Sequence, residues 1–362
     1  CNNNQLCVPH KLCYNITFSD FFQIMVREQK MRIIKSAFLA TTILSAGVTS
    51  ASAEVNVMAS IKPIHSLVSA VMDGAGTPSL IIEGAGSPHN YALKPSQAAA
   101  LQDADLVFWV GHDLEAFLEK AIDSVALNAR SIALSDAHGL TKIKFREGGS
   151  FDAHGHDEHN EHDEHDKHDD HDKHDDHDDH DKHDDHGHEG YDPHVWLDPE
   201  NAKALIHEIE EALVAADPEN AATYERNAEA MMRKLDALIT EIDAELEPVK
   251  GKGYVVFHDA YQYFERRFGV SAVGSITVSP EILPGAKRVS ELQEKVKSLD
   301  ATCVFSEPQF EPKLVTTITE NTTARTGVLD PLGASMEGGP GLYFTLIRTM
   351  AHSLKDCLLG KS

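Results

Sequence analysis

The stretch "VNVMASIKPIHSLVSAVMDGAGTPSLIIE", residues 55–83, indicates the architecture of the chain. It opens with a strand-like apolar run at 55–61. An amphipathic helical segment follows at 63–72. A second strand-like run, 78–83, comes after a turn that contains two glycines. Short apolar runs that alternate with helices are typical of a parallel sheet covered on both faces. This stretch therefore predicts an α/β fold.

The same alternation continues through the chain in two units. The first unit adds strands at 105–111 and 130–135 and helices at 94–104 and 114–125. The second unit has strands at 254–260, 301–307 and 325–333 and helices at 261–269, 290–300, 312–322 and 341–359. We expect two lobes, each a mostly parallel sheet flanked by helices. Ligands of such sheets bind at the carboxyl ends of the strands, so the natural binding cleft lies between the lobes.

A long helix is expected between the two units. Asp198 with Pro199 and Asp217 with Pro218 are typical helix starts. The second of these helices runs for about thirty residues, or roughly 45 Å at 1.5 Å per residue, which favours a rigid connector. The expected domains are an extension from upstream of the true start at 1–30, a signal peptide at 31–53, a first lobe at 54–217 with a disordered insert at 152–190, a linking helix at 218–248, and a second lobe at 249–362.

The segment "MRIIKSAFLATTILSAGVTSASAEV", 31–55, has the features of a secretory signal peptide. A short basic region precedes a mostly apolar run at 37–48, and Ala51-Ser52-Ala53 is a small-x-small cleavage site. The alternative is a short membrane anchor, but the apolar run is shorter than the ~20 residues that a span needs. We therefore expect a periplasmic protein that begins near Glu54.

Cysteine usage agrees with export. Cys1, Cys7 and Cys13 precede the expected mature start, which leaves Cys303 and Cys357 as an even pair. In an oxidising compartment this pair favours a disulfide over two buried thiols. Such a bridge would stabilise the fold by roughly 4 kcal/mol in the chain-entropy description.

The formal net charge is −26, and half of this excess lies in residues 154–188. That segment holds sixteen Asp or Glu, three Lys and thirteen His. The carboxylates repel one another and nothing apolar is available to bury, so we expect disorder. The rest of the chain is mildly acidic and has no basic patch, which argues against a nucleic-acid partner.

The histidines of this insert are expected to be weak auxiliary metal ligands, because each binding event must order a disordered chain. The alternative is a solvated spacer that happens to be rich in histidine. The auxiliary ligands are His154, His156, His159, His162, His165, His168, His171, His174, His177, His180, His183, His186 and His188.

Four polar residues outside the insert are candidate ligands of a tight metal site. His89 follows the strand-like run 78–83 and its turn, and His258 and Asp330 directly follow strands. His194 stands just ahead of the helix that starts near Asp198. Three imidazoles and one carboxylate in one cleft form a typical tetrahedral Zn²⁺ site.

The remaining histidines of the lobes have simpler explanations. His65, His207 and His352 lie within predicted helices, whereas His112 and His138 lie in turns. We interpret them as surface, core or capping residues.

Three other functions compete with zinc binding. A zinc hydrolase would need a general base beside an open site, as in H-E-x-x-H. The sequence contains no such motif, and Glu281 is the nearest candidate base. An adhesin-like surface protein would need a lipid-anchoring cysteine where Glu54 stands. We therefore expect a binding protein and not an enzyme. A manganese or nickel binding protein would differ only in the metal.

Six motifs resemble the ZnuA-type periplasmic zinc-binding proteins of ABC importers, in the cluster 9 metal-binding family. The resemblance covers residues 54–362 and includes an acidic, histidine-rich insert. The motifs are "SPHNYALKPSQ", "DLVFWVG", "DPHVWLDPENA", "VVFHDAYQYFERRFG", "TVSPEILPGAKRVSEL" and "VLDPLG".

The resemblance implies a carrier that delivers Zn²⁺ to an ABC transporter permease after a limited hinge movement. We expect the carrier to be a monomer. It implies His89, His194 and His258 as ligands, with Asp330 at the position of the fourth. Manganese members typically have a carboxylate where His258 stands, which favours zinc. Pro88 stands where some zinc members have a ligating Glu, and Asn90 stands where Asp is common. The fourth ligand is therefore Asp330, a water molecule, or both.

Overall fold

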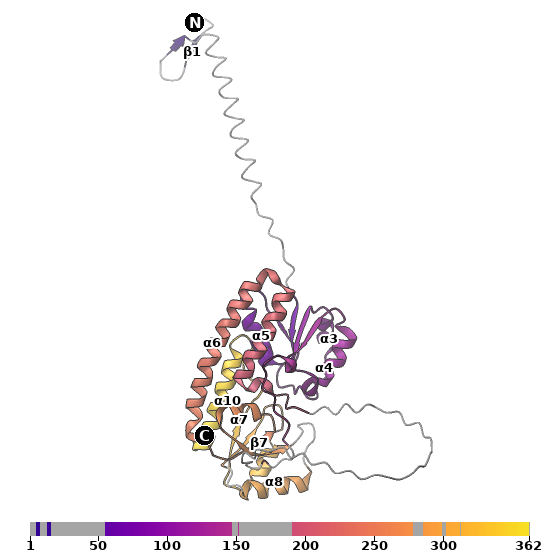
Figure 1. The fold of residues 1–362 in the computed structure, drawn as a ribbon, viewed down its shortest axis with the longest axis vertical. Coiled ribbons are helices and arrows are strands. Elements are labelled where there is room, and N and C mark those ends of the chain that lie inside the picture. Colours follow the sequence, from indigo (N-terminus) through magenta and orange to yellow (C-terminus); the bar gives the residue numbers. More distant parts are fainter. Residues whose placement is uncertain are drawn as a thin grey trace, which may run out of the picture. The chain divides into compact units, whose positions relative to one another are not determined.

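The computed structural model describes residues 5–7, 13–15, 55–146, 151, 190–277, 285–298, 302–311 and 313–361 (Figure 1). The expected signal peptide, all thirteen insert histidines and Glu281 lie outside these ranges. Residues 1–53 form a unit separate from residues 54–362. In the first unit, β1 (Gln5–Cys7) pairs antiparallel with β2 (Cys13–Asn15). Within the described ranges, no helix combines the length and apolar character that a membrane span requires.

The first lobe is a four-stranded parallel sheet with the strand order β4-β3-β5-β6. Its strands are β3 (Val57–Ala59), β4 (Ser79–Leu80), β5 (Leu106–Trp109) and β6 (Arg130–Ala133). Its helices are α2 (Lys62–Val71), α3 (Pro95–Gln102) and α4 (His112–Val125), and a 3₁₀ turn, η1 (Leu134–Asp136), follows β6. The strands β3 and β5 are buried throughout, which is why they read as continuous apolar runs.

The second lobe is also a four-stranded parallel sheet, with the order β10-β9-β7-β8. Its strands are β7 (Tyr254–His258), β8 (Ala272–Thr277), β9 (Cys303–Ser306) and β10 (Arg325–Val328). Its helices are α7 (Gln262–Phe268), α8 (Ala286–Ser298), α9 (Lys313–Thr319) and α10 (Leu342–Leu359). The expected α/β fold with two lobes is confirmed. Strand β8 was not expected, because Gly274 and Ser275 interrupt its apolar pattern.

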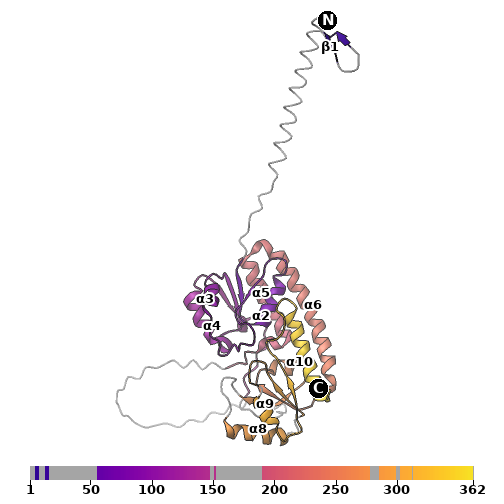
Figure 2. The same cartoon turned by 180° about the vertical axis from the view of Figure 1, so that it is seen from behind.

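Two helices connect the sheets, as Figures 1 and 2 show from opposite sides. They are α5 (Pro199–Ala216) and α6 (Ala221–Leu246), and the 3₁₀ turns η2 (Val195–Leu197), η3 (Pro218–Asn220) and η4 (Glu247–Val249) border them. The side chain of Asp198 caps α5 by accepting from the Glu200 amide at 2.8 Å. Helix α6 has 26 residues and is about 39 Å long. It packs against α2 of the first lobe and α10 of the second.

The hydrophobic core follows this arrangement. One cluster of buried residues runs from the first sheet through α5, α6 and α10 to one face of the second sheet. A separate cluster lies between the other face of the second sheet and α8 and α9. Both faces of the second sheet are therefore covered.

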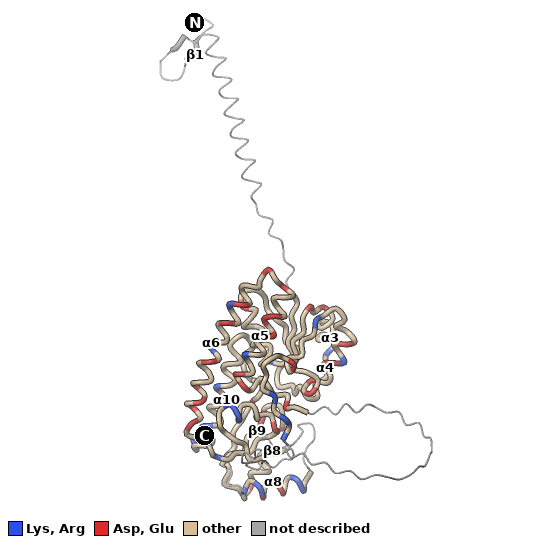
Figure 3. The backbone as a smooth tube through the Cα atoms, in the orientation of Figure 1, with Lys and Arg blue, Asp and Glu red and all other residues tan. Residues whose placement is uncertain are grey.

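The exposed side of α6 carries many acidic residues (Figure 3). One of them, Glu241, accepts hydrogen bonds from Nε and Nη2 of Arg348 on α10, at 2.8 and 2.7 Å.

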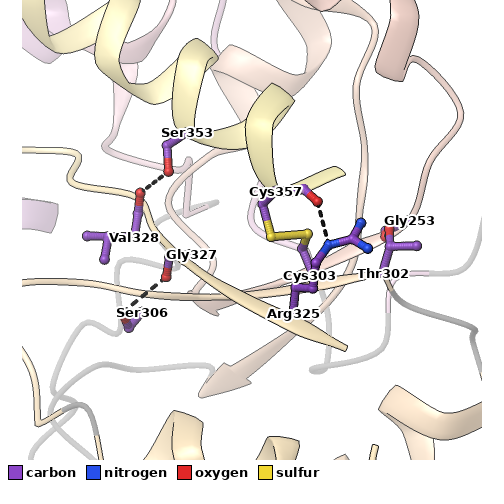
Figure 4. Close-up of a disulfide and its surroundings, with 9 residues drawn as sticks. All are labelled: Gly253, Thr302, Cys303, Ser306, Arg325, Gly327, Val328, Ser353 and Cys357. Atoms are coloured by element: carbon purple, nitrogen blue, oxygen red, sulfur yellow. Dashed lines mark hydrogen bonds between the residues drawn. A yellow bond between two sulfur atoms is a disulfide. The ribbon is translucent and has the colours of Figure 1, made fainter. Parts of the chain in front are cut away.

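The expected disulfide between Cys303 and Cys357 is present and joins the start of β9 to α10 (Figure 4). The two Cα atoms are 6.2 Å apart, within the usual range for a bridge. Beside it, Arg325 Nε donates to the Cys357 carbonyl at 2.8 Å. The bridge and this hydrogen bond attach the last helix to the second sheet.

Candidate metal centre

Three of the four candidate ligands come together. His89, His194 and His258 each offer one ring nitrogen, and these nitrogens all lie within 4.8 Å of one another. The ring centroids are 5.2 to 5.7 Å apart, and the Nε2 atoms of His194 and His258 are 3.3 Å apart. The imidazoles come from three distant segments of the chain, so only the packed fold creates the cluster.

The local structure explains how each imidazole reaches this point. His258 is the last residue of β7 and thus lies at the carboxyl end of the second sheet. His89 lies in the irregular segment between β4 and α3. His194 directly precedes η2, and Trp196 of that turn donates its indole N–H to the Pro331 carbonyl at 2.9 Å. This hydrogen bond connects the segment that carries His194 to the second lobe.

Buried carboxylates orient two of the imidazoles. His194 Nδ1 donates to Asp192 Oδ1 at 2.6 Å, and Asp192 Oδ2 accepts from Gln262 Nε2 at 3.0 Å. His258 Nδ1 donates to Glu307 Oε1 at 2.8 Å. A carboxylate on Nδ1 fixes the tautomer and makes Nε2 a better metal ligand. Both rings therefore direct Nε2 toward the centre of the cluster, where the two Nε2 atoms lie 3.3 Å apart.

The electrostatics of the cluster favour the neutral form of His89 and His194, but not of His258. Burial lowers the pKa of His89 to about 2, and the other two imidazoles add to this effect. Burial, followed by His258, lowers the pKa of His194. Burial alone would also lower the pKa of His258. The charge of Glu307, its hydrogen bond to the ring and the charges of Asp192 and Asp259 together outweigh burial and raise the pKa. At neutral pH His89 and His194 are uncharged, which is the protonation state that binds metal.

Asp330, the fourth candidate, has another role in this structure. Its Oδ1 accepts from the amides of Leu332 and Gly333 at 3.1 and 2.9 Å, and from Gln309 Nε2 at 3.0 Å. Its Oδ2 accepts from the Ala334 amide at 2.6 Å. Within the described ranges, the possible metal ligands that lie within 4.8 Å of one another are the three histidines, and Asp330 is not one of them. Asp330 holds the turn that follows it, and its role as a ligand stays a prediction.

Several residues that the sequence interpretation did not single out also belong to the centre. Asp192 and Glu307 orient imidazoles, and Phe310 stacks on Phe257 with centroids 4.6 Å apart. Glu307 directly follows β9, the neighbour of β7, so the rule of carboxyl ends could have identified it. The cavity at the cluster is lined by Ser87, Pro88, His89, His194, Trp196, His258, Glu307, Gln309, Phe310, Pro331 and Leu332.

Other histidines of the lobes pair with local groups. His65 Nε2 lies 3.0 Å from the Pro78 carbonyl. His112 was expected in a turn as a capping residue, but it is the first residue of α4, and its Nδ1 lies 2.6 Å from Glu119 Oε2. His352 Nε2 lies 3.0 Å from Asp356 on the same helix.

The family model and the curated relatives agree on one family. The family described as "Zinc-uptake complex component A periplasmic" (ZnuA) matches residues 57–357. The "High-affinity zinc uptake system protein ZnuA" of Brucella abortus (strain 2308) is 58% identical over 332 residues, which cover 91% of this chain and 99% of that protein. The protein of the same description from Haemophilus ducreyi is 41% identical over 317 residues, covering 88% and 97%.

A solved structure described as "Crystal structure of ZnuA" has a similar fold. It matches with a TM-score of 0.67 and 23% identity, and the match covers 84% of this chain and 99% of that one.

Proposed function

The chain belongs to the ZnuA family, and from this membership we propose that it captures Zn²⁺ between its lobes and delivers the ion to the membrane permease of an ABC importer. The observation that carries the proposal is the cluster of His89, His194 and His258. Neutral nitrogen ligands in a tetrahedral arrangement suit zinc, whereas manganese favours carboxylates. The fourth position is taken by Asp330, a water molecule, or both. We place the protein in the periplasm, where the family description places its members.

Binding without catalysis is part of the proposal. The two carboxylates beside the imidazoles, Asp192 and Glu307, already accept hydrogen bonds from the Nδ1 atoms of His194 and His258. A general base must be able to take a proton from a bound water molecule. These hydrogen bonds orient the ligand imidazoles, which supports a role of the two carboxylates in holding the ion.

The contacts between the lobes support a limited hinge movement. Lys62 Nζ of the first lobe donates to the carbonyls of Gly333, Ala334 and Met336 in the second lobe, at 3.1, 2.8 and 3.0 Å. Opening the cleft widely would break all three hydrogen bonds of a partly buried ammonium group. We therefore propose that zinc enters and leaves through a hinge movement small enough to keep the lobes in contact at Lys62.

Zinc stoichiometry tests the proposed function. We expect the full chain to bind one tight zinc and several weak equivalents, and deletion of residues 152–190 to remove only the weak ones. Titration calorimetry and native mass spectrometry measure both quantities. A variant with all thirteen insert histidines replaced by serine keeps the length and the acidic charge, and it should behave like the deletion. Loss of the tight site in either variant would contradict the proposal.

Metal choice is expected to depend on His258. In His258→Asp, a harder oxygen replaces a nitrogen ligand, and the new carboxylate lies near Glu307, which is 2.8 Å from the native ring. We expect weaker zinc binding and a smaller difference between the zinc and manganese affinities. Competition titrations with both metals measure this difference, and His258→Ala is the control that removes the ligand without adding oxygen. Equal zinc-to-manganese ratios in the two variants would show that His258 does not set the preference.

A further inference from the structure

The guanidinium group of Arg146 lies between two carboxylates of the second lobe, those of Asp259 and Glu265. Its Nε is 3.1 and 3.0 Å from the two oxygens of Asp259, and Nη2 donates to Asp259 as well. Its Nη1 and Nη2 lie 2.9 and 3.1 Å from the two oxygens of Glu265. The carboxylate side chains are only 11% and 6% exposed. A single planar group thus satisfies both carboxylates in a geometry that an ammonium group cannot reproduce.

These two carboxylates belong to the support of one imidazole. Asp259 directly follows His258, and the Ala260 amide donates to the His258 carbonyl at 3.0 Å in the same tight turn. Glu265 lies on α7, and its Oε2 also accepts from the Ala272 amide at the start of β8, the strand beside β7. Arg146 therefore holds the turn that carries His258 against the helix and the strand next to it.

The segment that carries Arg146 also supports a second imidazole. The Asp192 amide donates to the Ile143 carbonyl at 2.8 Å, and Asp192 orients His194. The hydroxyl of Tyr263, on α7, accepts from the Ile143 amide at 3.1 Å and donates to the Asp192 carbonyl at 2.8 Å. The segment 143–146 thus lies between the supports of His194 and His258 and contacts both.

A last contact covers the guanidinium group. Arg146 Cζ lies 3.8 Å from the centroid of the Phe151 ring. The Phe151 amide donates to the Val273 carbonyl of β8 at 3.3 Å. An arginine stacked on an aromatic ring and held by two carboxylates has little freedom to move.

We propose that Arg146 is a positioning residue of the metal centre: it fixes the relative placement of His194 and His258, so metal affinity depends on it although it contacts no ligand nitrogen. This inference rests on the proposed function of the cluster. Substitutions of residues that orient metal ligands typically lower metal affinity 10–100-fold. Arg146 acts one contact further from the ligands, so we expect an effect near the lower end, about tenfold.

The test is Arg146→Lys, which keeps the positive charge but removes the planar fork. We expect its zinc affinity to fall about tenfold in competition with a chromophoric chelator. We also expect the visible absorption of bound Co²⁺ to change in shape, because this spectrum reports ligand geometry. The matched control is Arg348→Lys. Arg348 on α10 also binds a carboxylate through two nitrogens, that of Glu241 on α6. The control should match the wild type in affinity and spectrum.

A neutral variant covers the case in which Arg146→Lys does not fold. Arg146→Met, Asp259→Asn and Glu265→Gln together remove the network without leaving a lone buried charge. We expect lower zinc affinity together with an altered Co²⁺ spectrum. In either variant, wild-type affinity, or lower affinity with a wild-type spectrum, would overturn the positioning role. Wild-type protein that bound no zinc in the same titration would instead refute the proposed function.

Discussion

Replacing His194 with alanine should abolish tight zinc binding. The change removes one of three converging nitrogens. It also removes the hydrogen bond between His194 Nδ1 and the buried Asp192 Oδ1, which are 2.6 Å apart. Changes to residues that merely orient ligands cost 10–100-fold in affinity, so loss of a ligand should exceed about 100-fold. That corresponds to more than about 2.7 kcal/mol of binding free energy. Competition with a chelator of known affinity measures the loss.

The matched control for this substitution is His207→Ala. His207 lies on α5, has a largely exposed side chain and faces Glu210 and Glu211. Its removal should leave the affinity for zinc unchanged. A His194→Ala protein that keeps its secondary structure and binds zinc within threefold of the wild type would rule out the histidine cluster as the tight site.

Removing the disulfide should give the largest loss of stability among the changes considered. The bridge closes a loop of 54 residues, for which the chain-entropy description predicts about 4 kcal/mol. We expect Cys303→Ala with Cys357→Ala to lower the free energy of unfolding by about that amount. Urea unfolding under oxidising conditions measures it, and wild-type protein treated with a reductant is the control for the loss of the two sulfur atoms.

Zinc binding by the folded double variant separates stability from function. Cys303 lies at the amino end of β9, whereas Glu307 follows the carboxyl end, next to His258. The affinity for zinc should therefore stay close to that of the wild type. A change in unfolding free energy below about 1 kcal/mol would show that the unfolded chain gains little freedom when the bridge is absent.

Much of the fold was predictable because it depends on local patterns. Buried parallel strands such as β5 are continuous apolar runs. Asp198 followed by Pro199 is a helix-start signal that depends only on neighbouring residues, and α5 begins there. Strand β8 was missed because Gly274 and Ser275 have weak strand preference. It forms at the edge of the sheet because the backbone of β7 is there to pair with it.

The candidate site divides in the same way. Residue type and the end of an apolar run were enough to select His258 as a ligand candidate, because the carboxyl ends of parallel strands meet at one edge. The same reasoning selected Asp330, but it could not show that four donors from Gln309 and the following turn occupy the Asp330 oxygens. Which donors a carboxylate meets depends on how the turn after it folds.

The pattern of apolar and polar residues was therefore sufficient for the order of the strands and helices apart from β8. The cysteine count indicated the disulfide, and the strand ends indicated the three imidazoles as candidates. Packing of the lobes was needed to bring Glu307 to His258 across 49 residues and Arg146 to Asp259 across 113. Periodicity reports only which face of an element is buried. A hydrogen bond between distant side chains has no periodic signal, because it forms only where two separately folded segments meet.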